Sequence, residues 1–372
     1  MIKKLENIPK ILLVLHFPPP IHGSSMVGQY IKDSILINSE FNTKYINLST
    51  SKTVDEIGTN PFIKINRYFK VLLKTIINLI NHNPKIVYLA ITAKGIGLYK
   101  DFPIALLVKL FGKKLVLHYH NKGVCLNQHK FFDHILYRVL FKNTKVILLS
   151  ERLYSDVAKY VNKEDIFFCP NGIPVSNFAE EILPKTNEVP KLLFLSNLIE
   201  SKGLFILLKA LKALNDKGIA FHCNIVGGEG DISLNQLNHK INDLNLNNCV
   251  TYLGKKYGDD KYKIFQYSDI FVFPTFYHNE TFGLVNIEAM MFKLPVISTC
   301  EGAIAEIIDD NETGFLVNKR DSVDLANKIQ LLIENPSLRK SMGEKGREKF
   351  EKKYTLFHFE QNMTEILRKI SQ

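Results

Sequence analysis

The sequence has few cysteines, and they do not cluster. Five cysteines are spread over 372 residues, none forms a Cys-x-x-Cys pair, and none combines with histidine at the spacing of a zinc site. An odd number of widely separated thiols is typical of a reducing compartment. We therefore expect a cytoplasmic protein whose cysteines are neither paired nor metal-bound.

The sequence also lacks a hydrophobic run long enough to cross a membrane. A transmembrane helix needs about 18 or more apolar residues, and the best candidate, Phe102–Phe111, contains Lys109. Two lysines precede the apolar run Ile11–Leu15, but three prolines and no small-residue cleavage site follow it, so a signal peptide is not indicated. We expect this run to form a buried first strand.

Acidic residues are scarce in the first half of the chain. Residues 1–170 contain 24 basic and 11 acidic side chains, a net charge of +13, whereas residues 171–372 contain 24 and 26, a net charge of −2. The first half is therefore suited to an anionic partner.

Apolar runs alternate with helical patterns along both halves of the chain, which predicts parallel sheets covered on both sides. In the first half we expect strands at Ile11–His16, Ile86–Ile91, Leu115–His118 and Val146–Leu149, and helices at Ser25–Leu36, Phe62–Ile80, Pro103–Phe111 and Lys130–Phe141. In the second half we expect strands at Leu192–Leu195, Ala220–Val226, Val250–Leu253, Asp269–Phe273, Pro295–Ser298 and Phe315–Val317. The helices expected there are Leu204–Leu214, Ile232–Leu244, Leu284–Phe292, Val323–Glu334, Pro336–Lys352 and Phe357–Ile370.

A proline-containing stretch without periodicity, residues 174–190, separates the two alternating regions and reads as a linker. The sequence therefore predicts an α/β protein with two Rossmann-like, doubly wound domains facing a cleft. The expected domains are residues 1–175 and 190–355, with a final helix at 356–372 that packs back on the first domain. Ligands bind beyond the carboxyl ends of parallel strands, so we expect the motifs to lie in strand-to-helix loops.

The strongest motif is the segment from Glu280 to Glu288, which reads ETFGLVNIE. A helix starting near Phe282 would place the carboxylate of Glu280 at its N-terminus and that of Glu288 about two turns into the helix. The exposed N–H groups at its start would favour an anion, and Gly283 would let that anion approach the backbone. Taken alone, the motif also fits an ordinary helix with an acidic first turn.

A second motif, Ser196-Asn-Leu-Ile-Glu-Ser-Lys202-Gly203, follows a predicted strand and opens a helix, where a lysine can reach a diphosphate. The alternative is a surface lysine. The glycines of Val226–Gly230 do not have the spacing of a dinucleotide-binding fingerprint. Downstream are Glu301-Gly-Ala-Ile-Ala-Glu306 and the segment ETGFLV, which ends at Val317.

In this order and spacing, the motifs resemble the retaining glycosyltransferases of family 4, which have the GT-B fold. The E-x7-E element from Glu280 to Glu288, together with LPVIST and ETGFLV, carries most of the resemblance. Phe17–Met26 resembles the family's glycine-bearing first loop, and His118–Gly123 resembles its histidine-bearing loop.

The resemblance implies a role for each matching residue. Glu280 would contact hydroxyls of the donor sugar, and Glu288 would hold the ribose of the nucleotide. His118 would touch the donor sugar or line the acceptor side, with His120 as a weaker candidate. The diphosphate would be bound by Lys202 and by the backbone amides of Phe282, Gly283 and Leu284, and Gly23 would leave room for phosphate and sugar.

Asn197 departs from the family pattern, which usually has an arginine at this position. One of two expected phosphate-binding cations is therefore missing, so that the diphosphate rests on Lys202 and the helix N-terminus, or another basic residue substitutes. No DxD motif for a divalent cation is present. We expect a metal-independent enzyme without a cofactor, whose nucleotide-sugar donor is a substrate, and we assign no protein nucleophile.

The segment Phe62–Lys74 places Lys64, Arg67, Lys70 and Lys74 three or four residues apart, with apolar residues beside them. Such a helix can lie on an anionic membrane, or it can pack on a core with its basic side in water. No nucleic-acid-binding motif accompanies the charge.

The function expected from the resemblance is transfer of a sugar from a nucleotide donor to a glycan or lipid-linked acceptor, in polysaccharide or lipopolysaccharide synthesis. This would take place in the cytoplasm or at the inner face of the plasma membrane. One alternative is a nucleotide-sugar 2-epimerase of the same fold, which would need acid/base carboxylates that are not evident. The other is a catalytically silent nucleotide-sugar-binding protein, for which Asn197 is the main argument. The sequence leaves open whether the nucleotide is UDP or GDP.

Overall fold

The computed structural model describes residues 8–19, 22–49, 61–180 and 188–372. The side chains of residues 61–64, which include Phe62 and Lys64 of the predicted basic helix, lie outside the described part. Contacts divide the chain into two compact units. The first unit comprises Met1–Asn171 and Leu356–Gln372, and the second comprises Gly172–Thr355.

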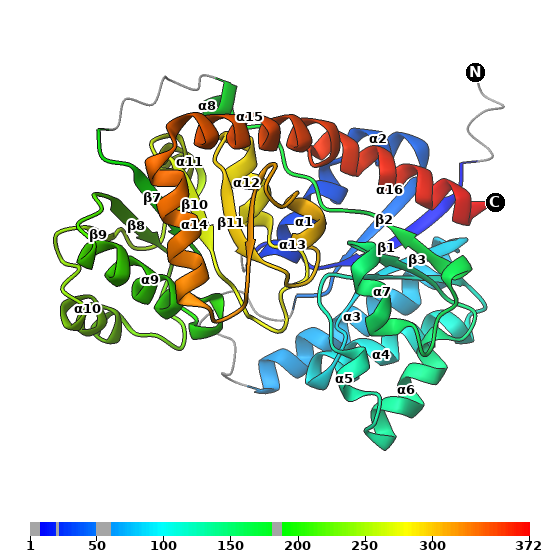
Figure 1. Cartoon of the computed structure of the whole chain (residues 1–372). Helices are drawn as coiled ribbons and strands as arrows, with labels where there is room; N and C mark the ends of the chain where they lie inside the picture. Colours follow the sequence, from blue (N-terminus) through cyan, green and yellow to red (C-terminus); the bar gives the residue numbers. More distant parts are fainter. Residues whose placement is uncertain (1–7, 20–21, 50–60, 181–187) are drawn as a thin grey trace. The chain divides into compact units, whose positions relative to one another are not determined.

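The first unit contains a six-stranded parallel sheet (Figure 1) with the order β2-β1-β3-β4-β5-β6. Its strands are β1 (Lys10–Leu15), β2 (Asn42–Asn47), β3 (Ile86–Ile91), β4 (Lys114–Tyr119), β5 (Lys145–Leu148) and β6 (Ile166–Phe168). The four strands predicted from the sequence are confirmed to within two residues. The edge strands β2 and β6 escaped prediction because their side chains are mostly exposed or half-buried, and they lack a continuous apolar run.

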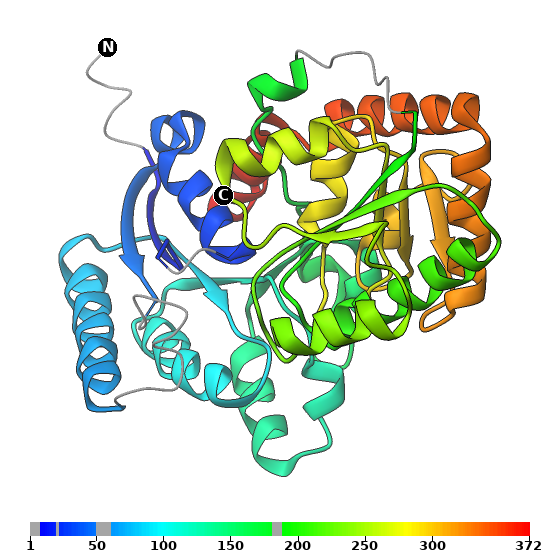
Figure 2. The ribbon, with the colours of Figure 1, turned by 90° about the vertical axis from the view of Figure 1, so that its left-hand side faces the viewer.

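Helices cover both sides of the first sheet (Figure 2). One layer consists of α1 (Gly23–Asp33), α2 (Ile35–Glu40) and α16 (Leu356–Ser371), whose side chains share a core with alternate residues of β1 and β3. The other layer consists of α3 (Pro61–Asn81), α4 (Gly95–Leu110) and α6 (Phe131–Phe141). Connections between parallel strands are right-handed. The chain adds β2 on one side of β1 and the later strands on the other, so the helices before and after β2 lie on opposite sides of the sheet. The short helices α5 (Val124–Asn127) and α7 (Tyr154–Val157) complete the unit.

Two helix predictions in the first unit were wrong in their bounds. The segment Ser25–Leu36 forms two helices, because the Ser34 side chain accepts a hydrogen bond from the backbone N–H of Ile37 and starts α2. Helix α4 begins at Gly95, so Pro103 lies inside it rather than in its first turn.

The second unit contains another six-stranded parallel sheet, with the order β12-β11-β10-β7-β8-β9. All six of its predicted strands are confirmed: β7 (Lys191–Leu195), β8 (His222–Val226), β9 (Val250–Tyr252), β10 (Ile270–Phe273), β11 (Val296–Thr299) and β12 (Gly314–Val317). Its helices are α8 (Asn177–Glu180), α9 (Leu204–Asp216), α10 (Leu234–Asp243), α11 (Gly258–Gln266), α12 (Leu284–Met291), α13 (Ile304–Ile307), α14 (Ser322–Glu334) and α15 (Pro336–Lys353). Helix α11 was not predicted; Phe265 is its one buried residue, so the sequence shows no apolar stripe there.

Each sheet has a point where the strand order reverses, between β1 and β3 in the first unit and between β7 and β10 in the second. Loops leaving the carboxyl ends of these strands diverge to opposite sides of the sheet and leave room for a ligand. The predicted α/β class with two doubly wound domains is confirmed, while the cleft between them stays a prediction. Within the described residues, no helix is both long and apolar enough to span a membrane.

Candidate active site

Lys202 and Glu280 form an ion pair at the carboxyl edge of the second sheet. Lys202 lies in the loop after β7 and Glu280 in the loop after β10, on either side of the reversal point. The distance from Lys202 Nζ to Glu280 Oε2 is 2.5 Å, and the side chains are 15% and 12% exposed. The ammonium also lies 4.5 Å from the ring centroid of Tyr277. The structure therefore brings two predicted site residues into contact and shields both from most of the solvent.

Gly203 holds this loop in place. Its φ of +89° is a left-handed conformation, and a Cβ at this position would lie 2.1 Å from the carbonyl oxygen of Pro274. A side chain would therefore push the loop after β7 away from the loop after β10. The two loops are also joined by a hydrogen bond of 2.8 Å from the N–H of Phe276 to the carbonyl of Ser201.

Helix α12 presents its N-terminus beside Glu280. It begins at Leu284, as in the predicted span Leu284–Phe292 and two residues after the start near Phe282 considered for the motif, and Gly283 is its left-handed N-cap with a φ of +74°. A Cβ on Gly283 would lie 2.6 Å from Asn286 Nδ2. Among the described residues, no hydrogen-bond partner is found for the backbone N–H groups of Phe282, Gly283 and Leu284. These groups and the helix dipole can therefore receive an anion.

Glu288 pairs with a lysine that sequence reasoning missed. Lys261 Nζ lies 2.6 Å from Glu288 Oε1, and the two side chains are 18% and 12% exposed. Burial alone would lower the pKa of Lys261, but the charge of Glu288 and its hydrogen bond outweigh burial and raise it. Lys261 belongs to α11, which also escaped prediction, and no motif distinguishes it from surface lysines. The two glutamates of the E-x7-E element thus have separate lysine partners.

Asn197 lies in the same loop as Lys202, and its Oδ1 accepts a hydrogen bond of 3.4 Å from the N–H of Gly228. The side chain of Lys255, in the loop after β9, packs against Gly228, so that a Cβ on this glycine would lie 1.9 Å from Lys255 Cε. A basic side chain therefore stands beside the loop in which the expected arginine is missing. Lys255 belongs to none of the motifs recognised in the sequence.

In the first unit, His118 is the next-to-last residue of β4 and is fully buried. Its Nδ1 is hydrogen-bonded to the hydroxyl of Tyr88, and its Nε2 has no partner within the described residues. Burial, reinforced by His120, lowers the pKa of His118 well below its usual value, and burial raises that of Tyr88 well above. Both groups are therefore neutral near pH 7, and the tautomer of the imidazole decides which of the two donates in this hydrogen bond. The unpartnered Nε2 donates to a ligand in one tautomer and accepts from it in the other.

Three further histidines gather near His118. The ring centroids of His118 and His120 are 4.2 Å apart, and those of His16 and His22 are 6.0 Å apart. Burial and neighbouring positive charges lower the pKa of His16 to about 3 and that of His120 to about 4. Gly23 is the first residue of α1, directly after the N-cap residue His22. His16 and His22 were not predicted, although both lie in the loop that follows β1.

The predicted site residues are therefore divided between the two units. Glu280, Lys202, Glu288, Phe282, Gly283, Leu284 and Asn197 belong to the second unit, and His118 and Gly23 belong to the first. Within the described residues, no group of three His, Cys, Asp or Glu side chains is placed to hold a metal ion. The second-unit residues combine a cation, a helix N-terminus and two carboxylates, which suits a phosphorylated, hydroxyl-bearing ligand.

Solved structures share this architecture. A glycosyltransferase from Rickettsia africae aligns over 98% of this chain and 99% of its own, with a TM-score of 0.73 and 22% identity. Anabaena HepE, solved with UDP, aligns over 97% of this chain and all of its own, with a TM-score of 0.73 and 18% identity. HepE has also been solved with UDP-glucose. These likenesses show that the chain has the GT-B fold.

The sequence comparisons point to the same class. Residues 175–349 match the family model of the glycosyl transferases group 1. The capsular polysaccharide biosynthesis glycosyltransferase CapM of Staphylococcus aureus is 30% identical over 257 residues, which is 64% of this chain and 66% of the relative. The chain spans 66%, 54% and 37% of the length of the first three curated relatives, all of which are named glycosyltransferases.

Proposed function

We propose that this chain is a retaining glycosyltransferase of family 4, which moves a sugar from a nucleotide-sugar donor to a glycan or lipid-linked acceptor. The observation that carries the proposal is the buried Lys202–Glu280 pair beside the unpartnered amides of α12. A cation and a helix N-terminus at one place favour the diphosphate of a donor. The neighbouring carboxylate can accept hydrogen bonds from hydroxyls of its sugar.

Donor binding would rearrange the ion pair. A diphosphate at the N-terminus of α12 carries more charge than Glu280 and competes with it for Lys202. Glu280 would then be released to accept hydrogen bonds from the sugar. Glu288, oriented by Lys261, would accept hydrogen bonds from the ribose hydroxyls.

Glycosyl transfer places negative charge on the departing diphosphate and positive charge on the anomeric carbon. Lys202 and the amides of Phe282, Gly283 and Leu284 are fixed donors for the leaving group, so their orientation needs no change during the reaction. His118 is proposed to contact the donor sugar or to line the acceptor side. We assign no protein nucleophile, and we propose that the reaction needs no metal ion.

Surface polysaccharide synthesis is the proposed setting. It is supported by the match to CapM, whose name refers to capsular polysaccharide. With a lipid-linked acceptor, the reaction would take place at the inner face of the plasma membrane, with an anionic membrane surface as a partner. The five free cysteines are compatible with a reducing cytoplasm.

A second candidate is a nucleotide-sugar-binding protein without catalytic activity. Asn197 favours it, because the neutral amide cannot supply the charge of the arginine expected in this loop. Lys255 beside Gly228 argues against it, since this lysine can supply a second cation.

A two-stage experiment tests the proposal. UDP- and GDP-sugars are first screened by thermal shift, because a ligand that binds only the folded protein stabilises it by RT ln(1 + [L]/Kd). Hydrolysis and transfer of the stabilising donor are then measured with acceptors from a membrane extract. Lys202→Ala should abolish the shift, while Lys209→Ala, an exposed lysine on α9, should preserve it. Binding without turnover would support the second candidate, and absence of any binding would refute both.

A further inference from the structure

The outer side of the helix layer α3–α4–α6 exposes an unusual amount of apolar surface. Thirteen of the 24 exposed large hydrophobic side chains among the described residues lie on these three helices, so the exposure is concentrated in one layer. They are Ile65, Phe69, Leu73, Ile77, Ile80, Ile96, Tyr99, Leu106, Leu110, Phe131, Phe132, Ile135 and Val139. Phe131 is 80% exposed and Leu110 is 73% exposed. Exposed apolar patches of this kind mark interaction sites.

Helix α3 shows that this exposure does not come from loose packing. Val71, Thr75 and Leu79 are buried and dock the helix on the sheet, while Phe69 and Leu73 point away and are 63% and 58% exposed. The helix therefore has an apolar inner side and a second apolar stripe facing outward. The sequence allowed either a membrane-binding helix or a core-packed helix with its basic side in water. The second interpretation accounts for the buried inner side of α3 but not for its exposed apolar stripe.

The charges on this layer are of one sign. Arg67, Lys70, Lys74, Lys100, Lys109 and Arg138 are exposed or half-buried on the described parts of the three helices. The acidic residues on these parts, Asp101 and Asp133, are 0% and 1% exposed. We call this mixture of exposed apolar and cationic side chains the apolar–basic face.

A groove runs between α4 and α6 on this face. Its volume is about 730 Å³, and its lining includes apolar side chains of Leu106, Leu110, Ile135 and Val139 and basic side chains of Lys109, Lys113, Arg138 and Lys142. Lys109 Nζ donates a hydrogen bond of 2.7 Å to Thr144 Oγ1, which fixes the ammonium. Burial and the charge of Lys142 lower the pKa of Lys109 to about 8. An anion in the groove would relieve this crowding of positive charges.

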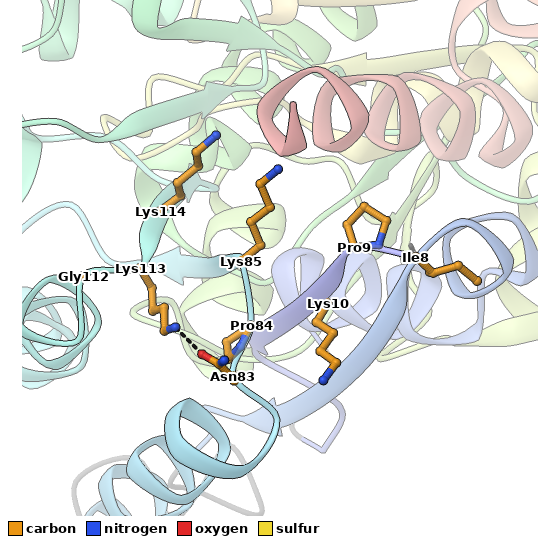
Figure 3. Close-up of a pocket in the computed structure, with 9 residues that line it drawn as sticks. All are labelled: Ile8, Pro9, Lys10, Asn83, Pro84, Lys85, Gly112, Lys113 and Lys114. Atoms are coloured by element: carbon orange, nitrogen blue, oxygen red, sulfur yellow. Dashed lines mark hydrogen bonds between the residues drawn. The ribbon is translucent and has the colours of Figure 1, made fainter. Parts of the chain in front are cut away.

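The positive charge continues along the amino edge of the sheet (Figure 3). A second hollow of about 610 Å³ is lined by Lys10, Lys85, Lys113 and Lys114, and no acidic residue lines it. It shares Gly112 and Lys113 with the groove, so the two hollows are neighbours. Lys114 Nζ donates to the carbonyl of Ile370 in α16 at 3.1 Å, and Lys113 is hydrogen-bonded to Asn83.

We propose that the apolar–basic face docks on a bilayer containing anionic phospholipids. The exposed aromatic and aliphatic side chains would enter the interfacial region, and the lysines and arginines would contact lipid phosphates. The groove between α4 and α6 would receive a lipid headgroup, with its apolar lining toward the first acyl carbons. Docking itself does not depend on the proposed function. Its biological role, which is access to a lipid-linked acceptor, rests on that function.

Other occupants fit this surface less well. A second copy of the chain would bring two cationic faces together in a symmetric contact, which is repulsive. A nucleic acid would satisfy the cations but leave Leu73, Leu110 and Val139 without apolar partners. An anionic bilayer offers phosphates to the cationic side chains and acyl chains to the apolar ones.

Vesicle cosedimentation tests the proposal with the full chain. Vesicles of phosphatidylcholine alone are compared with vesicles containing about 30% phosphatidylglycerol, at low and at high salt. We expect at least about tenfold stronger binding to the anionic vesicles at low salt, and a loss of most of this difference at 1 M salt, where the Debye length falls to about 3 Å.

Two variants separate the two chemistries. Lys70→Glu/Lys74→Glu/Arg138→Glu/Lys142→Glu should reduce binding to anionic vesicles at least about tenfold, and Phe131→Ser/Phe132→Ser should weaken the part of the binding that resists salt. Matched controls carry the same kinds of change elsewhere: Lys217→Glu/Lys340→Glu/Lys352→Glu/Lys353→Glu in the second unit, and Val323→Ser/Phe357→Ser. Both controls should bind like the wild type.

Thermal melting and nucleotide-sugar binding are measured for every variant. Intact donor binding shows that a variant is folded, and it keeps failure of the docking proposal separate from failure of the proposed function. The docking proposal is overturned if the wild type ignores anionic vesicles at low salt, or if the control variants lose as much binding as the others. The docking proposal is also overturned if the wild type does not bind vesicles but dimerises in a concentration-dependent way that the four-charge variant abolishes. The partner of this face would then be a second copy of the chain rather than a bilayer.

Discussion

At the scale of single residues, the site is organised by two lysine–glutamate pairs of similar geometry. Lys202–Glu280 and Lys261–Glu288 have N–O distances of 2.5 Å and 2.6 Å and are both mostly buried. A buried ion pair is weak evidence for stability, because desolvation offsets much of the attraction. We therefore expect these pairs to serve ligand binding, where each carboxylate has a different partner.

The two glutamates should differ in their kinetic effect. On its proposed role, Glu280→Ala would remove a contact close to the reacting sugar, and it should lower kcat about 100-fold with little change in donor KM. On its proposed role, Glu288→Ala would remove a remote contact to the nucleotide, and it should raise donor KM about tenfold or more. Steady-state kinetics with the donor identified by thermal shift measures both. Unchanged kinetics, or the same change in both variants, would contradict these roles.

The sequence predicted the residues that belong to a contiguous motif and missed those that do not. Glu280, Glu288 and Lys202 lie in segments whose order and spacing are recognisable. Lys261 and His16 become site candidates only when separate loops converge, because each stands alone in the sequence. Local patterns carry no information about such long-range contacts.

At the scale of single elements, the loop from β7 to α9 depends on one backbone conformation. Gly203→Ala introduces a Cβ 2.1 Å from the carbonyl oxygen of Pro274 and strains a φ of +89°. We expect it to lower the free energy of unfolding by about 2–4 kcal/mol and to weaken donor binding, because Lys202 is displaced.

Gly218→Ala is the matched control for this loop variant. Its φ is +73°, but a Cβ there would meet nothing within 4 Å. It should therefore lower the free energy of unfolding by only about 1 kcal/mol, which is the cost of the backbone conformation alone. Urea denaturation compares the two, and equal losses would show that the contact with Pro274 is unimportant.

Helix α12 underlies a prediction about metal ions. Its free N–H groups and Lys202 can neutralise charge on the leaving diphosphate, so activity should persist in EDTA within about twofold. Turnover is measured with and without the chelator. Loss of activity that Mn²⁺ or Mg²⁺ restores would reject metal independence.

Elements with a continuous apolar pattern were predictable, and half-exposed ones were not. Strand β3 is buried throughout and was predicted with correct bounds. Strand β2 is an edge strand in which Ile46 is the one buried residue, so its alternation is too weak to recognise. Gly283 shows a further limit, because its left-handed conformation and the close approach of Asn286 and Ile304 are not visible in the local sequence.

At the scale of the whole molecule, we expect two half-buried histidines to make stability depend on pH. The pKa values of His16 and His120 are lowered to about 3 and about 4 in the folded state, whereas the unfolded chain titrates near 6.5. Their contribution is fully present above pH 6.5. It is lost as the pH falls toward 4, because the unfolded state then binds more protons.

Thermal melting between pH 7.5 and pH 4.5 should show this loss, and His16→Asn/His120→Asn should reduce it by about 1–3 kcal/mol. His239→Asn, an exposed histidine on α10, is the control and should leave the pH profile unchanged. A double variant with the same pH profile as the wild type would show that these histidines do not cause the loss.

The return of the chain to the first unit has a consequence for biosynthesis. Phe359, Met363 and Leu367 of α16 complete the core formed by β1, β3 and α1, although about 350 residues separate them from Ile11. The second unit, Gly172–Thr355, is contiguous and can fold as soon as it leaves the ribosome. The first unit is synthesised earlier but must wait for the last helix, so during translation its apolar strands stay open to chaperones. Until α16 has emerged from the ribosome, the half of the chain that was synthesised first therefore stays the incomplete one.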